Sequence, residues 1–231
     1  MSYFPNPASG GVGGMYEYEN ATVMGIDQTN TYHPLWTAGV VAGTLDGWVF
    51  TAGASGAFTA VADLGGGQMR FTTGAPHGLA NGRVVFITSA SVAGYRPPNA
   101  TAFIIFNVGA STFDVTGVFT ATANGTWTAS ACLVAGTSAA GKYELFWSAS
   151  AKTGAGVNKT YKFEAFQNAA ELNKAAAWAI IDANGPSGFS GSAFVTVAAG
   201  DHICLACMNQ TDATDVTIVG MNLRMLRYAA P

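Results

Sequence analysis

The residues that could support chemistry are few and widely separated along the chain. His33, His77 and His202 each lack a second histidine or a carboxylate at the spacing that a metal site requires. The acidic side chains are also scattered, so the sequence marks no facing carboxylate pair for glycoside hydrolysis, although a pair made between subunits stays open. The segment Gly188–Ser192 lacks the last glycine of a nucleophile elbow. We therefore expect a protein that is not an enzyme and that holds no metal and no cofactor.

Two of the three cysteines, Cys204 and Cys207, form a C-x-x-C motif within a segment that has the composition of a strand. Side chains three residues apart on a strand point to opposite faces, whereas a zinc or redox pair requires a turn. An odd number of cysteines also gives no disulfide framework. The sequence thus predicts buried, reduced thiols, which are common among free cysteines.

Composition restricts the classes of partner. Charged side chains make up only 10% of the 231 residues, against about 25% in ordinary globular domains. No apolar run reaches the roughly 18 residues of a membrane span, and the net charge of −3 comes without a basic stripe. We expect binding to neither membrane nor nucleic acid. Burial of surface between subunits is the simplest explanation of the low charge.

The elements that must position these residues are strands. Apolar residues at Tyr143, Leu145 and Trp147 occupy every second position, and the same period recurs at Tyr161 and Phe163. Alternation with a period of two is typical of half-buried strands. No sustained helical period occurs elsewhere, so the sequence predicts an all-β fold.

The C-terminal half contains a predicted irregularity in a strand and a segment with two possible structures. The apolar positions of the last strand change phase at Gly220, which predicts a β-bulge at that glycine. Residues 169–177 fit either a helix, through a capping box of Asn168 and Glu171, or a turn followed by a strand. A strand is expected from Trp178 to Asp182.

The C-terminal half also resembles a known family. The segments that carry the resemblance are Gly141–Tyr143, Tyr161–Phe163, Ser190–Asn209 and Asp215–Tyr228. They are similar to the trimeric jelly-roll of complement-type and tumour-necrosis-type domains and of many phage virion proteins. The resemblance implies a jelly-roll β-sandwich, built from residues 20–62 and 128–231, that assembles as a homotrimer. Apolar residues of the last strand, Leu223 and Met225, are then expected to line the trimer contact.

A second resemblance covers residues 63–127. The residues His77-Gly78-Leu79, Gly82 and Thr112-Phe113-Asp114-Val115 resemble a small β-barrel module named for the first catalytic-cysteine half-domain of ubiquitin-activating enzymes. Copies of this module recur in phage tail and head proteins, and the block contains no cysteine for ubiquitin chemistry. Arg83 departs from the family, which usually has an acidic residue after the turn glycine. The resemblance implies an inserted small β-barrel that interrupts the jelly-roll.

Exposed aromatic side chains are the remaining candidates for binding. Residues 1–19 are rich in glycine and proline, and we expect them to form an extended N-terminal arm. The candidate partner-binding residues are Tyr3, Phe4, Tyr16 and Tyr18 in this arm, and Tyr95 and Arg96 in a loop of the inserted module.

Together the two resemblances indicate a structural protein of a tailed-phage virion, made in the bacterial host cytoplasm. A homotrimeric capsid decoration, cement or head-fibre protein is expected first, with the major capsid protein or another virion protein as partner. The alternative is the receptor-binding tip of a tail fibre or baseplate, where the inserted module would contact a host surface glycan. A polysaccharide depolymerase is a third interpretation.

Overall fold

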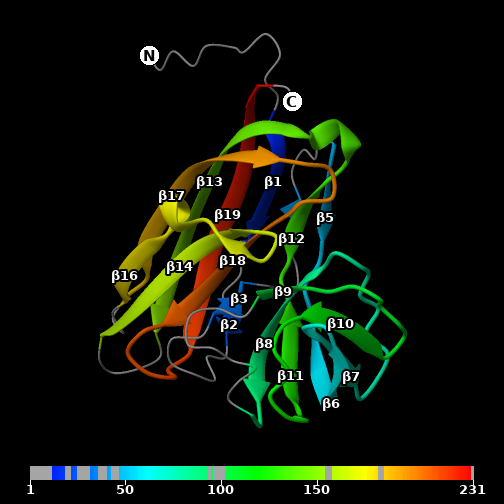
Figure 1. Cartoon of the computed structure of the whole chain (residues 1–231). Helices are drawn as coiled ribbons and strands as arrows, with labels where there is room; N and C mark the ends of the chain where they lie inside the picture. Colours follow the sequence, from blue (N-terminus) through cyan, green and yellow to red (C-terminus); the bar gives the residue numbers. More distant parts are fainter. Residues whose placement is uncertain are drawn as a thin grey trace, which may run out of the picture.

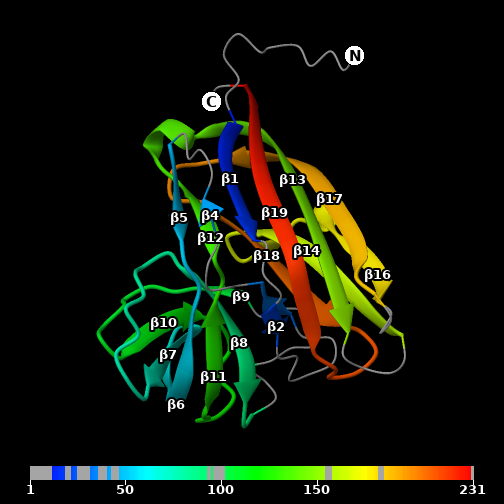
Figure 2. The same cartoon turned by 180° about the vertical axis from the view of Figure 1, so that it is seen from behind.

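Strands make up most of the described chain in a computed structural model, which describes residues 12–18, 22–24, 32–35, 41–42, 47–92, 95, 102–153, 158–181 and 185–229. The regular elements in these ranges are strands and short 3-10 turns such as Thr137–Ala139 and Asn173–Ala175. The expected all-β class is therefore confirmed. The strands form three antiparallel sheets (Figures 1 and 2).

Strands that are neighbours within a sheet are often far apart in the sequence. The first sheet contains β17 (Ser187–Val197), β13 (Gly141–Thr153), β19 (Val216–Ala229), β1 (Val12–Tyr18) and β4 (Val41–Ala42), and β2 (Thr22–Met24) pairs with β19. The second contains β15 (Ala170–Glu171), β14 (Lys159–Gln167), β18 (His202–Asn209), β12 (Cys132–Ala135) and β5 (Trp48–Thr51), with β16 (Ala177–Ile181) on β14 and β3 (His33–Pro34) on β18. The third contains β10 (Thr112–Thr116), β7 (Gln68–Thr73), β6 (Ala54–Gly65), β11 (Gly125–Ala129), β8 (Val84–Ala90) and β9 (Ala102–Ile104).

The main core lies between the first and second sheets. Tyr143, Leu145 and Trp147 of β13 point into it, as the period of two predicts, and Phe163 of β14 belongs to the same cluster. The indole N–H of Trp147 donates a hydrogen bond of 2.8 Å to the carbonyl oxygen of Ala175. This bond satisfies a polar group that would otherwise be buried without a partner, which is costly.

The expected bulge at Gly220 is confirmed. On β13, Ser150 and Ala151 are neighbours, but their partners on β19 are Gly220 and Ile218, so Val219 is the extra residue. Val216 and Ile218 are buried before the bulge, and Met221, Leu223 and Met225 are buried after it. The bulge therefore keeps one apolar side of β19 on the core in spite of the phase change.

The third sheet has a core of its own and is nearly closed. The backbone N–H groups of Phe106 and Asp114 each donate to the other's carbonyl oxygen at 2.9 Å, which brings β10 back beside the chain that follows β9. Phe71, Phe113 and Trp127 fill the interior, and the rings of Phe71 and Phe113 stack with their centroids 5.3 Å apart. The result is a barrel-like sheet at the opposite end of the molecule from the end of β19 (Figure 1).

This sheet begins earlier than the expected boundary between residues 62 and 63. β6 is one strand, whose residues 54–58 pair with β11 and whose residues 58–65 pair with β7. Gly56 lies opposite Trp127 within this strand pairing. A Cβ atom at Gly56 would lie 2.8 Å from the Trp127 indole, so this glycine makes room for a large side chain.

The second sheet is covered on both faces. Every residue of β18 is buried. One face packs on the first sheet, and the other forms a third cluster in which Tyr32, Val84 and Phe86 pack against Phe166 of β14. Since Val84 and Phe86 belong to β8, the third sheet is docked firmly on the second.

One expectation about local structure needs correction, and one open alternative is decided. Residues 12–18 of the expected arm form strand β1, which lies between β19 and β4 in the first sheet, whereas residues 1–11 lie outside the described residues. Pairing with two neighbours gives this glycine-rich segment the hydrogen bonds that it lacks in isolation. Residues 170–175 form β15 and a 3-10 turn in place of a helix, so the alternative of a turn followed by a strand holds, and the strand expected from Trp178 is confirmed as β16.

Candidate interaction surface

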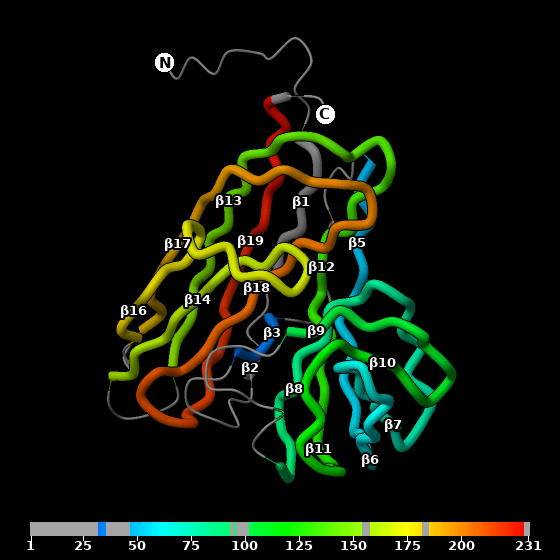
Figure 3. Tube along the Cα trace, in the orientation of Figure 1, coloured from blue at the N-terminus to red at the C-terminus, as the bar shows by residue number. Residues whose placement is uncertain are grey.

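The outer face of the first sheet carries the largest concentration of exposed aromatic residues among the described strands. Successive residues of β13, β17 and β19 alternate between the core and this outer face. The outward large apolar side chains are Phe146, Phe194, Leu226 and Tyr228, which are 40%, 69%, 38% and 56% exposed. We call these four residues the aromatic face. The three strands lie side by side, with β13 in the middle (Figure 3).

Strand register brings the members of the aromatic face together. Glu144 of β13 lies between Phe194 of β17 and Leu226 of β19, and residues directly opposite one another share a face. The rings of Phe194 and Tyr228 meet edge to face with their centroids 5.4 Å apart. Large clustered apolar side chains on a sheet surface are typical of contact sites.

The expected trimer-contact residues do not lie on this face. Leu223 and Met225 are fully buried in the core between the two sheets of their own chain. The bulge at Gly220 turns residues 221, 223 and 225 inward and residues 224, 226 and 228 outward. Leu226 and Tyr228 are therefore the exposed apolar residues of this strand, and the assignment of Leu223 and Met225 to a subunit contact was wrong.

Tyr95 is also not a surface residue. Its side chain is 1% exposed, and its ring lies 6.0 Å from that of Phe71 in the third sheet's core. The Tyr95 hydroxyl accepts hydrogen bonds from the backbone N–H groups of Thr120 (3.2 Å) and Ala121 (3.0 Å) and donates to the carbonyl oxygen of Ala121. Tyr95 thus fixes a loop of its own sheet, which corrects its assignment to partner binding. Arg96 lies outside the described residues.

Two of the four candidate binding residues in the expected arm lie in a strand, and the other two lie outside the described residues. Tyr16 and Tyr18 belong to β1, where they lie opposite Leu223 and Met221 of β19. Their position in a paired strand replaces the expected free arm. Tyr3 and Phe4 lie outside the described residues.

The two cysteines of the C-x-x-C motif occupy opposite faces of β18, as predicted. Cys204 belongs to the cluster beneath the third sheet, and Cys207 belongs to the main core. Both are buried and free, and burial raises the pKa of each thiol. His33 and His202 are buried too. Within the described ranges, no three His, Cys, Asp or Glu side chains gather in a way that could hold a metal ion.

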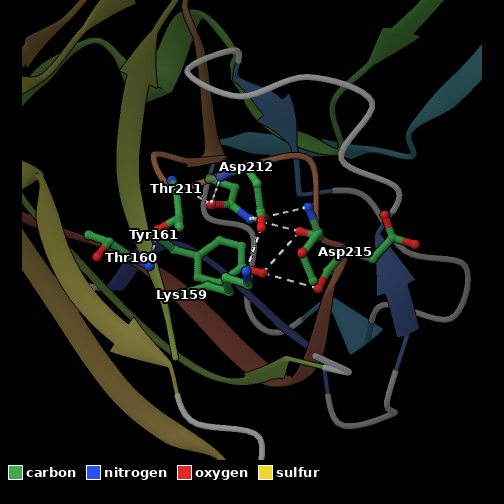
Figure 4. A network of polar contacts seen from close by, with 8 residues as sticks. Lys159, Thr160, Tyr161, Thr211, Asp212 and Asp215 are labelled. Carbon is green, nitrogen blue, oxygen red and sulfur yellow. Dashed lines mark hydrogen bonds and ion pairs between the residues drawn. The ribbon is translucent and has the colours of Figure 1, made fainter. Parts of the chain in front are cut away.

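A polar network that the sequence did not indicate shapes the loop between β18 and β19 (Figure 4). Lys159 forms an ion pair with Asp212, and this bond, with others from Thr214, lowers the pKa of the Asp212 carboxyl. The buried amide of Asn209 donates to Asp212 Oδ1 at 3.0 Å, and the Tyr161 hydroxyl donates to the carbonyl oxygen of Thr214 at 3.0 Å. Each group has a partner in its own chain, so the network holds the loop in place.

A second network brings two carboxylates together within one chain. The Tyr32 hydroxyl donates to Glu164 and, at 3.4 Å, to Glu171, and Lys162 Nζ lies 2.5 Å from Glu164 Oε2. Burial, and then the charge of Glu164, raises the pKa of Glu171. Glu164 is completely buried, so a bulky substrate cannot reach both carboxylates. The cluster instead ties the Tyr32 segment to β14.

Arg83 joins the third sheet to the chain segments that lead into and out of it. Its Nη2 atom donates to the carbonyl oxygens of Ala52 (2.9 Å) and Ser130 (3.0 Å), which precede β6 and follow β11. Arg83 is 6% exposed, so these bonds lie out of water, where hydrogen bonds from a charged group are strong. Arg83 thus ties the third sheet to the chain segments on both sides of it.

Comparison with known proteins adds no further identification. The chain matches no protein-family model, and no curated protein matches it either. The described part of the chain contains no helix with the length and apolar character needed to cross a membrane.

Proposed function

We propose that this chain is a non-catalytic structural protein of a tailed-phage virion, and that it assembles as a homotrimer through its aromatic face. The observation that carries the proposal is the cluster of Phe146, Phe194, Leu226 and Tyr228 on the outside of the first sheet. Only 10% of the chain is charged, which favours burial of such a surface. The face also carries Lys142, Glu144 and Arg224, so a contact between copies would bring charges of both signs together.

The order of the strands supports the jelly-roll interpretation. From β12 onward, the chain crosses repeatedly between the first and second sheets. The strands β12, β14, β16 and β18 belong to the second sheet, and β13, β17 and β19 belong to the first. Repeated crossing between two packed antiparallel sheets is typical of jelly-rolls. A trimer of such domains is what the sequence resemblance implies.

The connections of the third sheet support an inserted module. The chain leaves the second sheet after β5 and returns to it in β12, and these two strands pair with each other. Thr51 and Cys132 are register partners, so the ends of the excursion lie about one strand spacing apart, roughly 4.8 Å. Closely spaced ends are what an inserted unit requires.

The arrangement of the two ends favours a decoration or head-fibre role. Val12 of β1 lies opposite Leu226 of β19, so the described beginning and end of the chain lie together, away from the third sheet (Figure 1). A trimer built along these strands would attach at one end and present three third sheets at the other. Val118, in a loop of the third sheet, is 82% exposed, and this observation favours the receptor-binding tip as second candidate.

Location on the virion tests the proposal. Antibodies against the purified chain would be applied to virions from the lysate in which it is produced, and gold labels would be located by electron microscopy. We expect labels on the capsid exterior. Labels confined to the tail tip would favour the receptor-binding alternative, and the absence of label from every particle would overturn the virion role.

Purified Phe194→Ser should bind undecorated capsids more weakly than the control Ile180→Ser, which alters an exposed residue outside the aromatic face.

A further inference from the structure

Two of the three cysteines lie directly opposite each other on neighbouring strands. Cys132 of β12 and Cys204 of β18 are register partners in an antiparallel pair. Both side chains are buried in the cluster beneath the third sheet, so they share one face of the second sheet. The third cysteine, Cys207, faces the main core on the other side, and its partner on β14 is Phe163.

The hydrogen-bond pattern determines how close the two cysteines are. The N–H of Ala135 donates to the carbonyl oxygen of Asp201 at 2.8 Å, and the carbonyl oxygen of Ala135 accepts from the N–H of Gly200 at 2.7 Å, so the backbone groups of Ala135 point toward the chain that enters β18. Residues of a strand point these groups alternately to one neighbour and to the other, which makes Cys132, three positions away, the member of a non-hydrogen-bonded pair with Cys204. Pairs of that type hold their Cα atoms about 4.5 Å apart with the side chains close, inside the range of roughly 4.4 to 6.8 Å found in disulfides.

From this pairing we infer that Cys132 and Cys204 are a site of oxidative modification, where a cross-strand disulfide can form without rearrangement of the sheet. In the reaction, each thiol loses its proton, the two sulfur atoms form one S–S bond, and two electrons and two protons pass to the oxidant. A suitable small oxidant is an azodicarboxamide such as diamide, whose N=N bond becomes HN–NH. The inference does not depend on the proposed virion role.

Burial makes this reaction slow in the native state. Thiolates are the reactive species, and burial raises the pKa of Cys132 to about 11, although the charge of Arg83 opposes the shift. The pKa of Cys204 is raised further by burial and by Cys132 itself. Oxidation should therefore accelerate with rising pH and in urea concentrations below the unfolding transition, which open the strands transiently.

The test is to treat the purified full chain with diamide at neutral and alkaline pH, with and without such urea, and then alkylate it after full denaturation. Intact mass spectrometry should show one alkylated cysteine in place of three and the loss of two hydrogen atoms. Peptide mapping should link Cys132 to Cys204. The oxidised protein should keep its circular dichroism spectrum and unfold at a higher urea concentration, because the bridge closes a long loop in the unfolded chain.

Three single variants make the result specific. Cys207→Ala should still form the bridge, whereas Cys132→Ala and Cys204→Ala should each keep two alkylated thiols. Three alkylated cysteines in the oxidised wild type under all conditions would overturn the inference. A bridge that includes Cys207, or an oxidised form that is less stable than the reduced one, would also overturn it.

Discussion

Replacing Phe194 by serine should weaken assembly while leaving the fold of each subunit almost unchanged. Phe194 is 69% exposed on β17, so its ring contributes little to the core of its own chain. A phenylalanine side chain offers about 150–250 Å² of surface, of which roughly 140 Å² is then left in water. Covering that area at about 25 cal/mol per Å² would supply roughly 3.5 kcal/mol per subunit.

The effect on a trimer is multiplied by its symmetry. Three equivalent sites lose about 10 kcal/mol together, and the dissociation constant of a trimer scales with the square of concentration, so the midpoint concentration should rise by between about three and four orders of magnitude. The strand itself should change in stability by less than about 1 kcal/mol, the span of strand propensities. Ile180→Ser removes a similarly exposed side chain from β16 and serves as the matched control.

Sedimentation velocity over a concentration series would measure both variants, with near-ultraviolet circular dichroism as the check of folding. Phe194→Ser should dissociate at concentrations where the wild type and Ile180→Ser remain assembled. If Phe194→Ser associates as the wild type does, the aromatic face is not the subunit contact. If it unfolds, Phe194 supports the fold, contrary to its exposure.

Other predictions concern the interior. Leu223→Ala should lower the free energy of unfolding by about 3–5 kcal/mol, measured by urea titration. At urea concentrations where the variant stays folded, the mass of its assembly should equal that of the wild type. Gly125→Ala should destabilise the third sheet by at least about 3 kcal/mol, because the Cβ atom of the alanine would lie 2.0 Å from the Ser89 carbonyl oxygen. The control Gly188→Ala, whose Cβ atom would meet no atom within 4 Å, should change stability to urea little. Burial and the charge of Arg83 lower the pKa of His202 below 6.5, so stability should be full above pH 6.5 and should fall as the pH drops from 6.5 toward the folded pKa. His202→Gln should remove that decline. If the stability of this variant depends on pH as that of the wild type does, His202 is not the group responsible.

Local patterns in the sequence predicted the strands well. The period of two along β13 and β14 and the phase change at Gly220 are properties of neighbouring residues, and the structure confirms them. The placement of the two cysteines on opposite faces of β18 followed from the same rule. These predictions needed no knowledge of contacts between distant segments.

Which side of a strand faces the core could not be predicted in the same way. After the bulge, β19 has apolar residues on both sides, with Leu223 and Met225 on one side and Leu226 and Tyr228 on the other. Alternation shows which residues share a side, but only the packing of β14 and β18 decides which side is the core. The sequence therefore placed Leu223 and Met225 on a surface, whereas both are core residues.

Contacts between distant segments were also inaccessible from the sequence. Tyr32 and Glu164 are 132 residues apart, and nothing near either residue indicates that they meet. Arg83 was visible only as a departure from the module family, and its partners at Ala52 and Ser130 follow from how the third sheet is attached. Tyr95 was assigned to the surface because it was expected in a loop, whereas its ring completes the core of the third sheet.

The mass of the wild-type protein in solution tests the central claim most directly. One chain has a mass of 23.7 kDa, so a closed trimer has a mass of three times 23.7, about 71 kDa. Sedimentation equilibrium in physiological buffer should give this value over a wide range of concentrations. A single species of 23.7 kDa at all concentrations would contradict the trimeric account and leave the aromatic face without its proposed partner.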